Sequence, residues 1–531
     1  MKVHLMYADS DFDPDAALPL NEPDLAADLE LPTLLAAMGN GDKFLYEIAR
    51  HGLHASLASP AEIVYRQHVL ADCAANPGVV RDLYDLAAEA IGAERQVFGF
   101  IFRGAAPDTV LDRSRQVMEL YGASLRRLAE LGARHASSFR SAGFSRFFAM
   151  LASELTDDYF TETHERLAEL ALRRGTLMSA RLGKGGKGAG YVLRRHPPAR
   201  GWRDRLPGRN RAAYSFSIPE RDEAGARSLA QLTSRAVNDT ANSLAQSADH
   251  IKGFFQLLHA ELAFYLGCLN LRDQLLAQGQ PVCYPVPAPI GSDRLDARGL
   301  YDASLALILD RPVAGNDVAA DGKRLVMITG ANQGGKSTFL RSVGQAQLML
   351  QAGMFAPAEE LSASVCSGLF THYKREEDAT MERGKLDEEL DRMSAIADRI
   401  ADGGLLLCNE SFASTNEREG SQIAREAIRA LTETGIRVVF VTHLYDLAES
   451  IDHRGDGRSL FLRAQREHDG SRTYRLSAAA PLPTSYGEDL YRETFTGGLA
   501  RKCRPDPALT SAAFQSGRKD GADGWVRGCR R

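Results

Sequence analysis

The chain has 531 residues and a formal net charge of −5, with the apolar, charged and aromatic fractions of a globular protein. Its length suggests about three domains of roughly 150 residues each. The seven cysteines are scattered and form no C-x-x-C pair, which argues against a zinc site or a disulfide framework and favours reduced thiols in the cytoplasm. The N-terminus lacks the apolar core of a signal peptide, and no apolar run of about 18 residues occurs, so we expect no membrane partner.

Charge is unevenly distributed along the chain. We expect the acidic residues 1–30 to form a leader that is poorly ordered over residues 1–28. The stretch 173–211 is strongly basic with Asp204 as its only acid, and residues 501–531 are expected to be a basic, flexible tail. Such asymmetry favours a polyanionic partner, although a block of like charge is often only solvated surface.

Apolar residues recur at spacings of three and four between residues 31 and 172, which indicates helices. The expected helical segments are 31–38, 61–70, 79–91, 116–131, 144–155 and 159–172. Helix resumes from 221 to about 277. We therefore expect an α-helical core or lever domain over residues 31–280, interrupted by a reduced basic excursion at about 173–215.

This basic excursion mixes Gly, Lys and Arg with a short β-like piece and with the aromatic residues Trp202, Tyr214 and Phe216. A basic segment between two helical arms is a natural place to contact the phosphate backbone of DNA. We assign DNA binding to Lys184, Lys187, Arg194 and Arg195. The alternative is a flexible, solvated loop.

A proline-rich connector over residues 281–289 marks a domain boundary. After it, strands and helices alternate to about residue 495, which predicts a mostly parallel α/β domain over residues 281–500. The expected fold class is thus a helical lever domain followed by an α/β domain.

Segment 329–338 has the sequence T-G-A-N-Q-G-G-K-S-T and matches the phosphate-binding pattern G-x-x-x-x-G-K-[ST] of a P-loop. An apolar strand is expected before it at 325–328, and a helix after it at 339–351. In this frame glycines let backbone N–H groups approach phosphates, the lysine reaches the β- and γ-phosphates, and the first hydroxyl holds Mg²⁺. The residues assigned to the nucleotide are Gly330, Asn332, Gly334, Gly335, Lys336, Ser337 and Thr338. The alternative is a glycine-rich strand-to-helix turn without a ligand.

Two later apolar strands end in polar residues. The strand at 404–411 ends in Asn409 and Glu410. A strand-end Asp usually holds Mg²⁺ in this class of ATPase, and the neutral Asn409 offers the metal less charge. Glu410 stands where a carboxylate would polarise the attacking water. The strand at 436–443 ends in His443, which is expected to sense the γ-phosphate, although a lone histidine at a strand end is often structural.

Together these motifs resemble the ATPase domain of the MutS DNA mismatch-repair family, a branch of the ABC-type ATPases. The family has T-G-P-N-M-G-G-K-S-T where this chain has Ala331 for Pro and Gln333 for Met. Other similar segments are G-x-x-V-P-A at 353–358, D-E-x-x-x-x-T-x-x-x-x-G at 409–420, A-T-H at 441–443 and T-S-Y-G at 484–487. Asn316 stands where the family has an asparagine that touches the nucleotide, and Val313 stands near the place of its adenine-binding aromatic. More loosely, residues 31–280 resemble the family's lever helices and DNA clamp.

The resemblance implies a homodimer joined through the ATPase domains, with ATP as ligand, Mg²⁺ as cofactor and DNA as partner. It also implies a short form, because the residues before the helical region leave no room for the family's mismatch-reading and connector domains. The family's G-x-S-T-F signature is replaced at 383–389, where Gly384 remains and Lys385 would supply positive charge across the interface.

We therefore expect ATP-dependent engagement of distorted or branched DNA, in repair or recombination. Two alternatives remain open. One is an ATP-driven scaffold that acts on a protein or RNA complex, and the other is a nucleotide-binding switch that hardly hydrolyses ATP.

Overall fold

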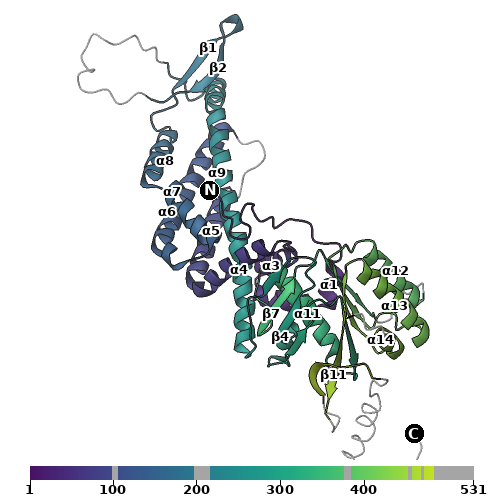
Figure 1. Cartoon of the computed structure of the whole chain (residues 1–531). Helices are drawn as coiled ribbons and strands as arrows, with labels where there is room; N and C mark the ends of the chain where they lie inside the picture. The colour runs from purple at the N-terminus through teal and green to yellow at the C-terminus, as the bar shows by residue number, and fades with distance from the viewer. Residues whose placement is uncertain (99–105, 197–215, 376–383, 453–456, 468–471, 483–531) are drawn as a thin grey trace, which may run out of the picture.

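The computed structural model describes residues 1–98, 106–196, 216–375, 384–452, 457–467 and 472–482. It shows a helical N-terminal part and an α/β C-terminal part (Figure 1). The predicted tail at 501–531, the T-S-Y-G segment at 484–487, Trp202 and Tyr214 lie outside the described residues.

All the helices predicted for the N-terminal part are present, with boundaries that differ by several residues in places. The helices are α1 (Glu22–Asp28), α2 (Leu31–Gly39), α3 (Lys43–His54), α4 (Pro60–Ala75), α5 (Pro77–Phe98), α6 (Pro107–His135), α7 (Ala142–Glu154), α8 (Asp157–Leu170) and α9 (Glu223–Ala277). Helix α3 was not among the predicted segments. Its first turn is capped by the Asp42 carboxylate, which accepts from the N–H groups of Phe44 and Leu45.

Helix α9 is the long central helix of the helical part. Its 55 residues give a length of about 80 Å at 1.5 Å per residue. One half packs among α2, α3, α5 and α6, and the other half extends away from the α/β part (Figure 1).

By length and composition alone, α9 is long and apolar enough to cross a membrane, although its sequence contains no uninterrupted apolar run of about 18 residues. An 18-residue window in it has a mean hydropathy of 1.2, yet 78% of that window is buried inside the fold. The core helix of a soluble protein passes the same test, so this composition is weak evidence for a span.

Residues 1–28 are ordered, which corrects the expectation of a poorly ordered leader. Leu5, Met6 and Phe12 are buried in the main core, and their backbone N–H groups donate to the Glu261 carboxylate of α9 over 2.6 to 3.4 Å. Burial raises the pKa of Glu261 to about 7, while these three donors oppose the rise. The apolar residues between the acids decide the outcome, because they join the main core, while the buried Glu22 pairs with Arg50 of α3.

The basic excursion contains an antiparallel hairpin of β1 (Met178–Leu182) and β2 (Gly188–Leu193), joined by the 3-10 turn η2 (Lys184–Gly186). The hairpin lies at the end of α9 farthest from the α/β part (Figure 1). Leu193 anchors its base in a small apolar cluster with Leu111, Val237 and Ala241.

The α/β part contains two sheets. The six-stranded sheet has the order β12-β11-β6-β10-β9-β8, in which all neighbours are parallel except the β11–β12 pair. Its strands are β6 (Leu325–Gly330), β8 (Leu369–Tyr373), β9 (Leu405–Asn409), β10 (Arg437–Val441), β11 (Ser459–Arg466) and β12 (Arg472–Ala478). This sheet matches the predicted mostly parallel arrangement.

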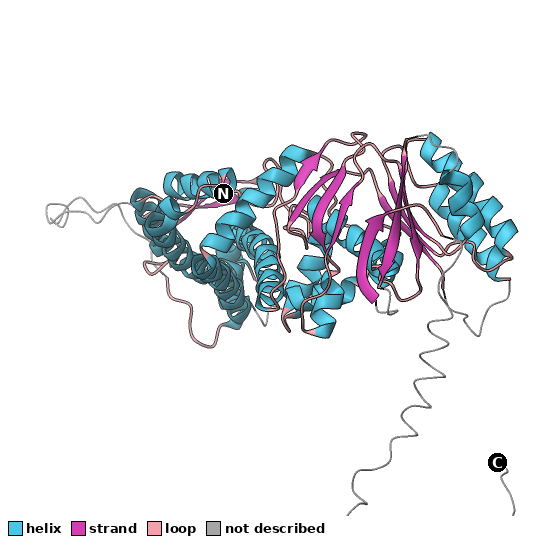
Figure 2. Ribbon diagram, turned by 60° about the horizontal axis from the view of Figure 1, so that its bottom comes forward, coloured by secondary structure: helices cyan, strands magenta, loops and turns pink. Residues whose placement is uncertain are grey.

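The second sheet is mixed and was not predicted. Its order is β3-β7-β4-β5, with β3 (Val286–Ala288), β4 (Leu295–Leu300), β5 (Asn316–Ala319) and β7 (Glu360–Ser364). Figure 2 shows the two sheets next to each other, with helices on the outer side of the larger sheet.

Burial on both faces explains why the strands of the larger sheet are continuous apolar runs. In β6, Val326 and Ile328 join the core that contains α11 (Lys336–Gln351), whereas Leu325 and Met327 join the core under the outer helices. The remaining helices of this part are α10 (Ala303–Leu309), α12 (Lys385–Ala397), α13 (Glu417–Glu433) and α14 (Tyr445–Asp452). Because β6, β9 and β10 are parallel neighbours, the segments that follow them meet at one edge of the sheet.

Candidate functional site

The loop between β6 and α11 depends on glycine at two adjacent positions. Gly335 has a φ of +88°, in the left-handed region that other residues rarely adopt. At Gly334, a Cβ atom would lie 2.7 Å from the Cβ of Ala464 and 2.9 Å from the carbonyl oxygen of Ala331. The loop therefore passes close to β11 and begins α11 immediately afterwards, so the first N–H groups of that helix have no acceptor within it.

Lys336 lies under this loop and is 6% exposed. Its Nζ donates to the carbonyl oxygens of Gly330 at 2.9 Å and Ala331 at 3.0 Å. Burial lowers the pKa of Lys336, and the nearby Glu410 carboxylate opposes this effect. An ammonium group has three N–H donors, so one remains for an anion, which would favour the charged form as Glu410 does.

Ser337 and Asn409, assigned to Mg²⁺ from the sequence, are in contact. The Ser337 hydroxyl donates to Asn409 Oδ1 at 2.8 Å. Adjacent ligands of an octahedral Mg²⁺ ion, each about 2.0–2.1 Å from the metal, lie roughly 2.9 Å apart. The two oxygens thus fit adjacent positions around Mg²⁺, although both are neutral. The described residues contain no group of three or more His, Cys, Asp or Glu side chains that could hold a metal.

Glu410 and His443, the two predicted catalytic residues, lie side by side. Glu410 follows β9, and its backbone N–H donates to the carbonyl oxygen of Val441 in β10 at 2.9 Å. His443 Nδ1 is 3.9 Å from Glu410 Oε1, an ion-pair distance rather than a hydrogen bond. His443 chiefly, and Lys336 more weakly, hold the pKa of Glu410 below its usual range, so Glu410 is a carboxylate at neutral pH.

A cavity of about 510 Å³ lies over these side chains, a size typical of small-ligand sites. The predicted residues that line it are Asn316, Asn332, Gly334, Gly335, Lys336, Ser337, Thr338 and Glu410. Each of the other predicted residues lies next to a lining residue: Gly330 next to Lys336, Asn409 next to Ser337, and His443 next to Glu410. The opposite wall comes from α10 and the segment after it, through Leu305, Leu309, Arg311, Pro312 and Val313.

Asn316 has a structural role that the sequence did not indicate. Its Oδ1 accepts from the N–H of Leu476 at 2.7 Å, and its Nδ2 donates to the carbonyl oxygen of Tyr474 at 3.3 Å. The buried side chain thus holds β12 against β5. Its contact with a nucleotide stays a prediction.

Tyr474 is a cavity residue that sequence reasoning missed. Its backbone φ is +58°, which is rare for an aromatic residue, and its side chain is 55% exposed. The backbone of Tyr474 passes within 3.4–3.5 Å of the place where a Cβ on Gly335 would lie. No pattern in the sequence connects this strand to the loop, because β12 reaches the cavity through its pairing with β11 and its contacts with β5.

The segment after Glu410 is braced by a buried histidine. His372 Nδ1 lies 2.7 Å from Ser411 Oγ, and its Nε2 lies 3.0 Å from the carbonyl oxygen of Glu389 in α12. Burial lowers the pKa of His372 to about 4, so the imidazole is neutral at pH 7. This contact links the start of the Glu410 segment to α12, whose exposed N-terminal end carries Gly384 and Lys385.

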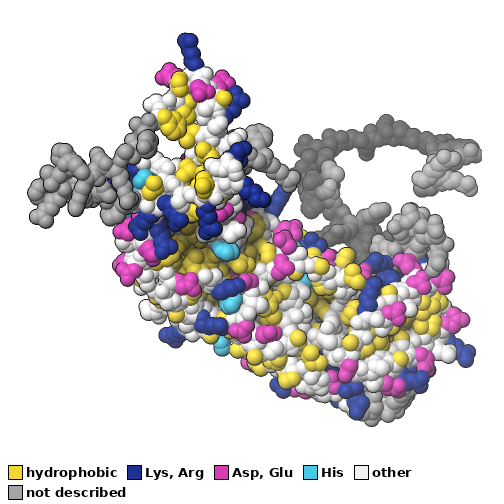
Figure 3. Space-filling model, turned by 90° about the horizontal axis from the view of Figure 1, so that it is seen from above, with side chains coloured by type: hydrophobic (Ala, Val, Ile, Leu, Met, Phe, Trp, Pro, Cys, Tyr) yellow, Lys and Arg dark blue, Asp and Glu magenta, His cyan; other side chains and the backbone are white. Residues whose placement is uncertain are grey.

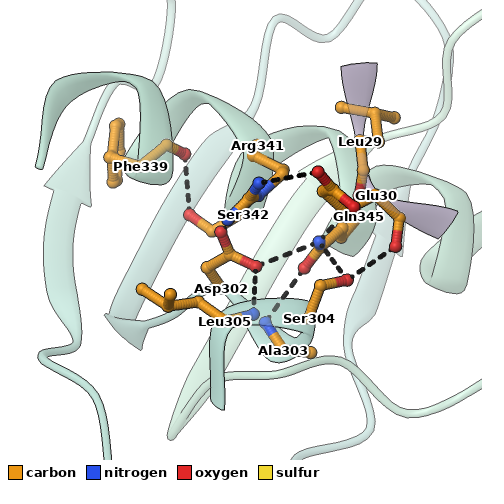
Figure 4. Close-up of polar contacts among 10 residues, drawn as sticks. All are labelled: Leu29, Glu30, Asp302, Ala303, Ser304, Leu305, Phe339, Arg341, Ser342 and Gln345. Carbon is orange, nitrogen blue, oxygen red and sulfur yellow. Dashed lines mark hydrogen bonds and ion pairs between the residues drawn. The ribbon is translucent and has the colours of Figure 1, made fainter. Parts of the chain in front are cut away.

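A buried polar network connects the cavity wall to the N-terminal segment (Figure 4). Nε2 of Gln345 in α11, which has two N–H donors, lies 3.0 Å from the Leu29 carbonyl oxygen, 3.1 Å from Asp302 Oδ1 and 3.0 Å from Ser304 Oγ. Asp302 caps α10 through the N–H of Leu305 and also pairs with Arg341 of α11 at 2.5 Å. The network therefore fixes α10 and α11 to the residues that lead into α2.

The predicted DNA-binding residues lie at or beside the hairpin, and their role in binding DNA stays a prediction. Lys184, Lys187, Arg194 and Arg195 are all exposed. Arg194 Nε donates to Ser179 Oγ at 2.7 Å, and Arg195 pairs with Glu169 of α8 at 2.5 Å. A further cavity of about 530 Å³ lies beside them, lined in part by Arg173, Arg174 and His196. The extended half of α9 separates this site from the nucleotide cavity (Figure 1).

The fold is that of a class of proteins in which a helical N-terminal region precedes an α/β domain with mixed sheets. Residues 58–278 match the family model described as MutS2 N-terminal domain, and residues 326–491 match the one described as MutS domain V. The chain belongs to the MutS family, which confirms the resemblance seen in its motifs.

Several curated relatives match part of the chain. The DNA mismatch repair protein MutS of Thermotoga sp. (strain RQ2) is 33% identical over 174 residues, which cover 32% of this chain and 22% of that protein. The DNA mismatch repair protein MutS 2 of Halobacterium salinarum is 29% identical over 193 residues, covering 36% and 21%. The MutS protein homolog 4 of Mus musculus is 27% identical over 185 residues, covering 34% and 19%. The chain thus spans about a fifth of the length of these relatives.

Proposed function

We propose that this protein binds ATP with Mg²⁺ in the 510 Å³ cavity, hydrolyses the ATP, and uses the cycle to control its hold on DNA. The observation that carries the proposal is the convergence of Lys336, the Ser337–Asn409 pair and the Glu410–His443 pair on one cavity. Membership of the MutS family supports ATPase activity, and the printed names of its relatives support a role in DNA repair.

Each side chain would have one task. The P-loop N–H groups and Lys336 bind the β- and γ-phosphates. Ser337 and Asn409 would hold Mg²⁺, which would offset phosphate charge. Glu410 is ionised, so it accepts a hydrogen bond from the attacking water and orients it. His443 lies next to Glu410 and would donate to the γ-phosphate, where charge is highest.

DNA would be held at the other end of the molecule. Lys184, Lys187, Arg194 and Arg195 lie on an exposed hairpin and contact phosphates without reading bases. We propose distorted or branched DNA as the substrate and a homodimer joined through the α/β parts. In that dimer Lys385, at the exposed start of α12, would approach the partner's nucleotide.

The test is steady-state ATPase activity of the wild type and Glu410→Gln, with and without perfect duplex, bulged duplex and four-way junction DNA. We expect DNA to stimulate the wild type. Glu410→Gln is expected to bind ATP normally and to hydrolyse it at least a hundredfold more slowly, because general-base assistance is typically worth about 10²–10⁴-fold.

Three outcomes would contradict parts of this proposal. Equal, slow turnover of both proteins with intact ATP binding would indicate a switch that hardly hydrolyses. ATPase activity that no DNA changes would favour a scaffold for a protein or RNA complex. DNA binding that does not weaken with rising salt would exclude the phosphate contacts of the hairpin.

A further inference from the structure

Leu182 is unusually exposed for a leucine in a strand. It ends β1 and is 85% exposed. The register explains why: Leu182 lies opposite Gly188 of β2, so no cross-strand side chain covers it. Val192 on the same hairpin is 47% exposed. The hairpin thus presents bare apolar side chains at the end of the molecule.

The surroundings of these apolar side chains are strongly basic. Residues 173–196 contain seven Lys and Arg residues and no Asp or Glu. Figure 3, which looks onto this end of the molecule, shows apolar and basic side chains next to each other, with some acidic side chains among them. Two copies of this surface would bring like charges together, so its charge favours a polyanion over a second copy of the chain.

Backbone hydrogen bonds and apolar contacts hold the hairpin in place. The N–H of Gly183 donates to the Lys187 carbonyl oxygen at 2.7 Å, which closes the tip, and the N–H of Arg194 donates to the Leu177 carbonyl oxygen at 2.7 Å, which closes the base. Leu193 fixes the base to the apolar cluster on α6 and α9. The position of Leu182 is therefore set by folded structure, and the glycine-rich tip is thin enough to approach a groove.

We propose that this hairpin reads unstacked DNA, with Leu182 packing against base faces at a bulge or junction while Lys184 and Lys187 hold the flanking phosphates. The inference rests on the proposed DNA-binding function and adds how distortion is recognised. In an intact duplex the base faces are covered by stacking, so Leu182 would add little binding free energy there. At an unstacked step an apolar side chain can occupy the gap, as it does in proteins that wedge open the minor groove.

The experiment measures binding of the full chain to a perfect duplex and to the same duplex with a two-nucleotide bulge flanked by 2-aminopurine. The variants are Leu182→Ala, Leu182→Phe, Lys184→Ala and the control Leu20→Ala, since Leu20 is 82% exposed but lies in the N-terminal segment. Thermal melts and sedimentation check folding and the oligomeric state of each variant.

We expect Leu182→Ala to lower the preference for bulged over perfect duplex roughly fivefold to tenfold, within the range known for contacts with single bases. Leu182→Phe and Leu20→Ala are expected to keep the preference. Lys184→Ala is expected to weaken binding to both duplexes equally and to lower the salt slope by about 1. The 2-aminopurine signal should change on binding of the wild type and less with Leu182→Ala.

The other possible results would contradict either the proposed DNA binding or the proposed role of Leu182. If the wild type binds no DNA, the proposed function itself fails. If it binds and Leu182→Ala keeps the full preference, or loses affinity equally for both duplexes, DNA binding stands and the reading role of Leu182 is wrong. If Leu182→Ala instead changes the oligomeric state, the hairpin is a contact between copies and the inference is overturned.

Discussion

At the scale of single residues, Asn409 sets the charge of the candidate metal site. Its Oδ1 lies 2.8 Å from Ser337 Oγ, and neither group carries charge. We predict that Asn409→Asp lowers the Mg²⁺ concentration for half-maximal ATPase activity roughly tenfold, because a carboxylate binds this hard cation more strongly than an amide does. A magnesium titration at fixed ATP measures it.

The control for this titration is Asn416→Asp. It adds the same charge at the exposed N-cap of α13, where Asp is also a good cap. An unchanged magnesium requirement in Asn409→Asp would show that Asn409 does not face the metal.

Among the described residues that line the cavity Tyr474 is the aromatic one, whereas Val313, which also lines it, offers no ring. We predict that Tyr474→Ala weakens ATP binding roughly tenfold while tripolyphosphate binds as before, since a stacked base is worth about 1–3 kcal/mol. Tyr474→Phe keeps the ring and should bind ATP normally. Isothermal titration of both ligands measures this, and an equal loss for ATP and tripolyphosphate would refute base stacking.

At the scale of elements, His372 joins β8, the segment after β9, and α12. Its folded pKa of about 4 lies below the ordinary 6.5, so the unfolded chain binds more protons between these values. The stability that comes from this neutral histidine is therefore complete above pH 6.5 and is lost as pH falls toward 4.

We predict that lowering the pH from 7.0 to 5.5 costs the wild type about 1.2 kcal/mol more unfolding free energy than it costs His372→Gln. Urea unfolding at both pH values measures the difference. His164→Gln, a change at an exposed histidine of α8, should behave like the wild type. Identical pH dependence in wild type and His372→Gln would show that the buried ring does not resist protonation.

At the scale of the whole molecule, helix α11 is hydrogen-bonded to the N-terminal segment. It starts at the predicted nucleotide loop, and Gln345 in its middle contacts Asp302, the N-cap of α10, and the Leu29 carbonyl oxygen (Figure 4). The following helix α2 is held to α9 by hydrogen bonds from Asn270 and Gln274 to the carbonyl oxygens of Met38 and Ala37. A change at the phosphates therefore has a continuous hydrogen-bonded route to the helix that carries the hairpin.

We predict that Gln345→Leu costs about 1–3 kcal/mol of unfolding free energy, because it leaves buried partners unsatisfied. It should also shrink the effect of ATP on DNA affinity while leaving ATP affinity near normal. Urea unfolding and DNA titrations with and without ATP measure the two effects. Gln256→Leu, at an exposed position of α9, is the matched control. Full coupling in a destabilised Gln345→Leu would rule out this route.

The local sequence pattern was enough to predict many of the helices and strands and part of the candidate site. Helical spacing predicted the helices between residues 31 and 172 except α3, and the glycine motif with its flanking apolar runs predicted β6, α11 and the residues around Lys336. These features depend on neighbours within a few residues, so sequence spacing carries the information.

Only the tertiary structure decided the rest. The acidic N-terminus is ordered because its apolar residues pack on α9 and Glu261, which are remote in sequence. Tyr474 and Asn316 meet because distant strands place β5 beside β12 at the cavity. Contacts across long sequence separations depend on strand order and packing, which no local pattern encodes.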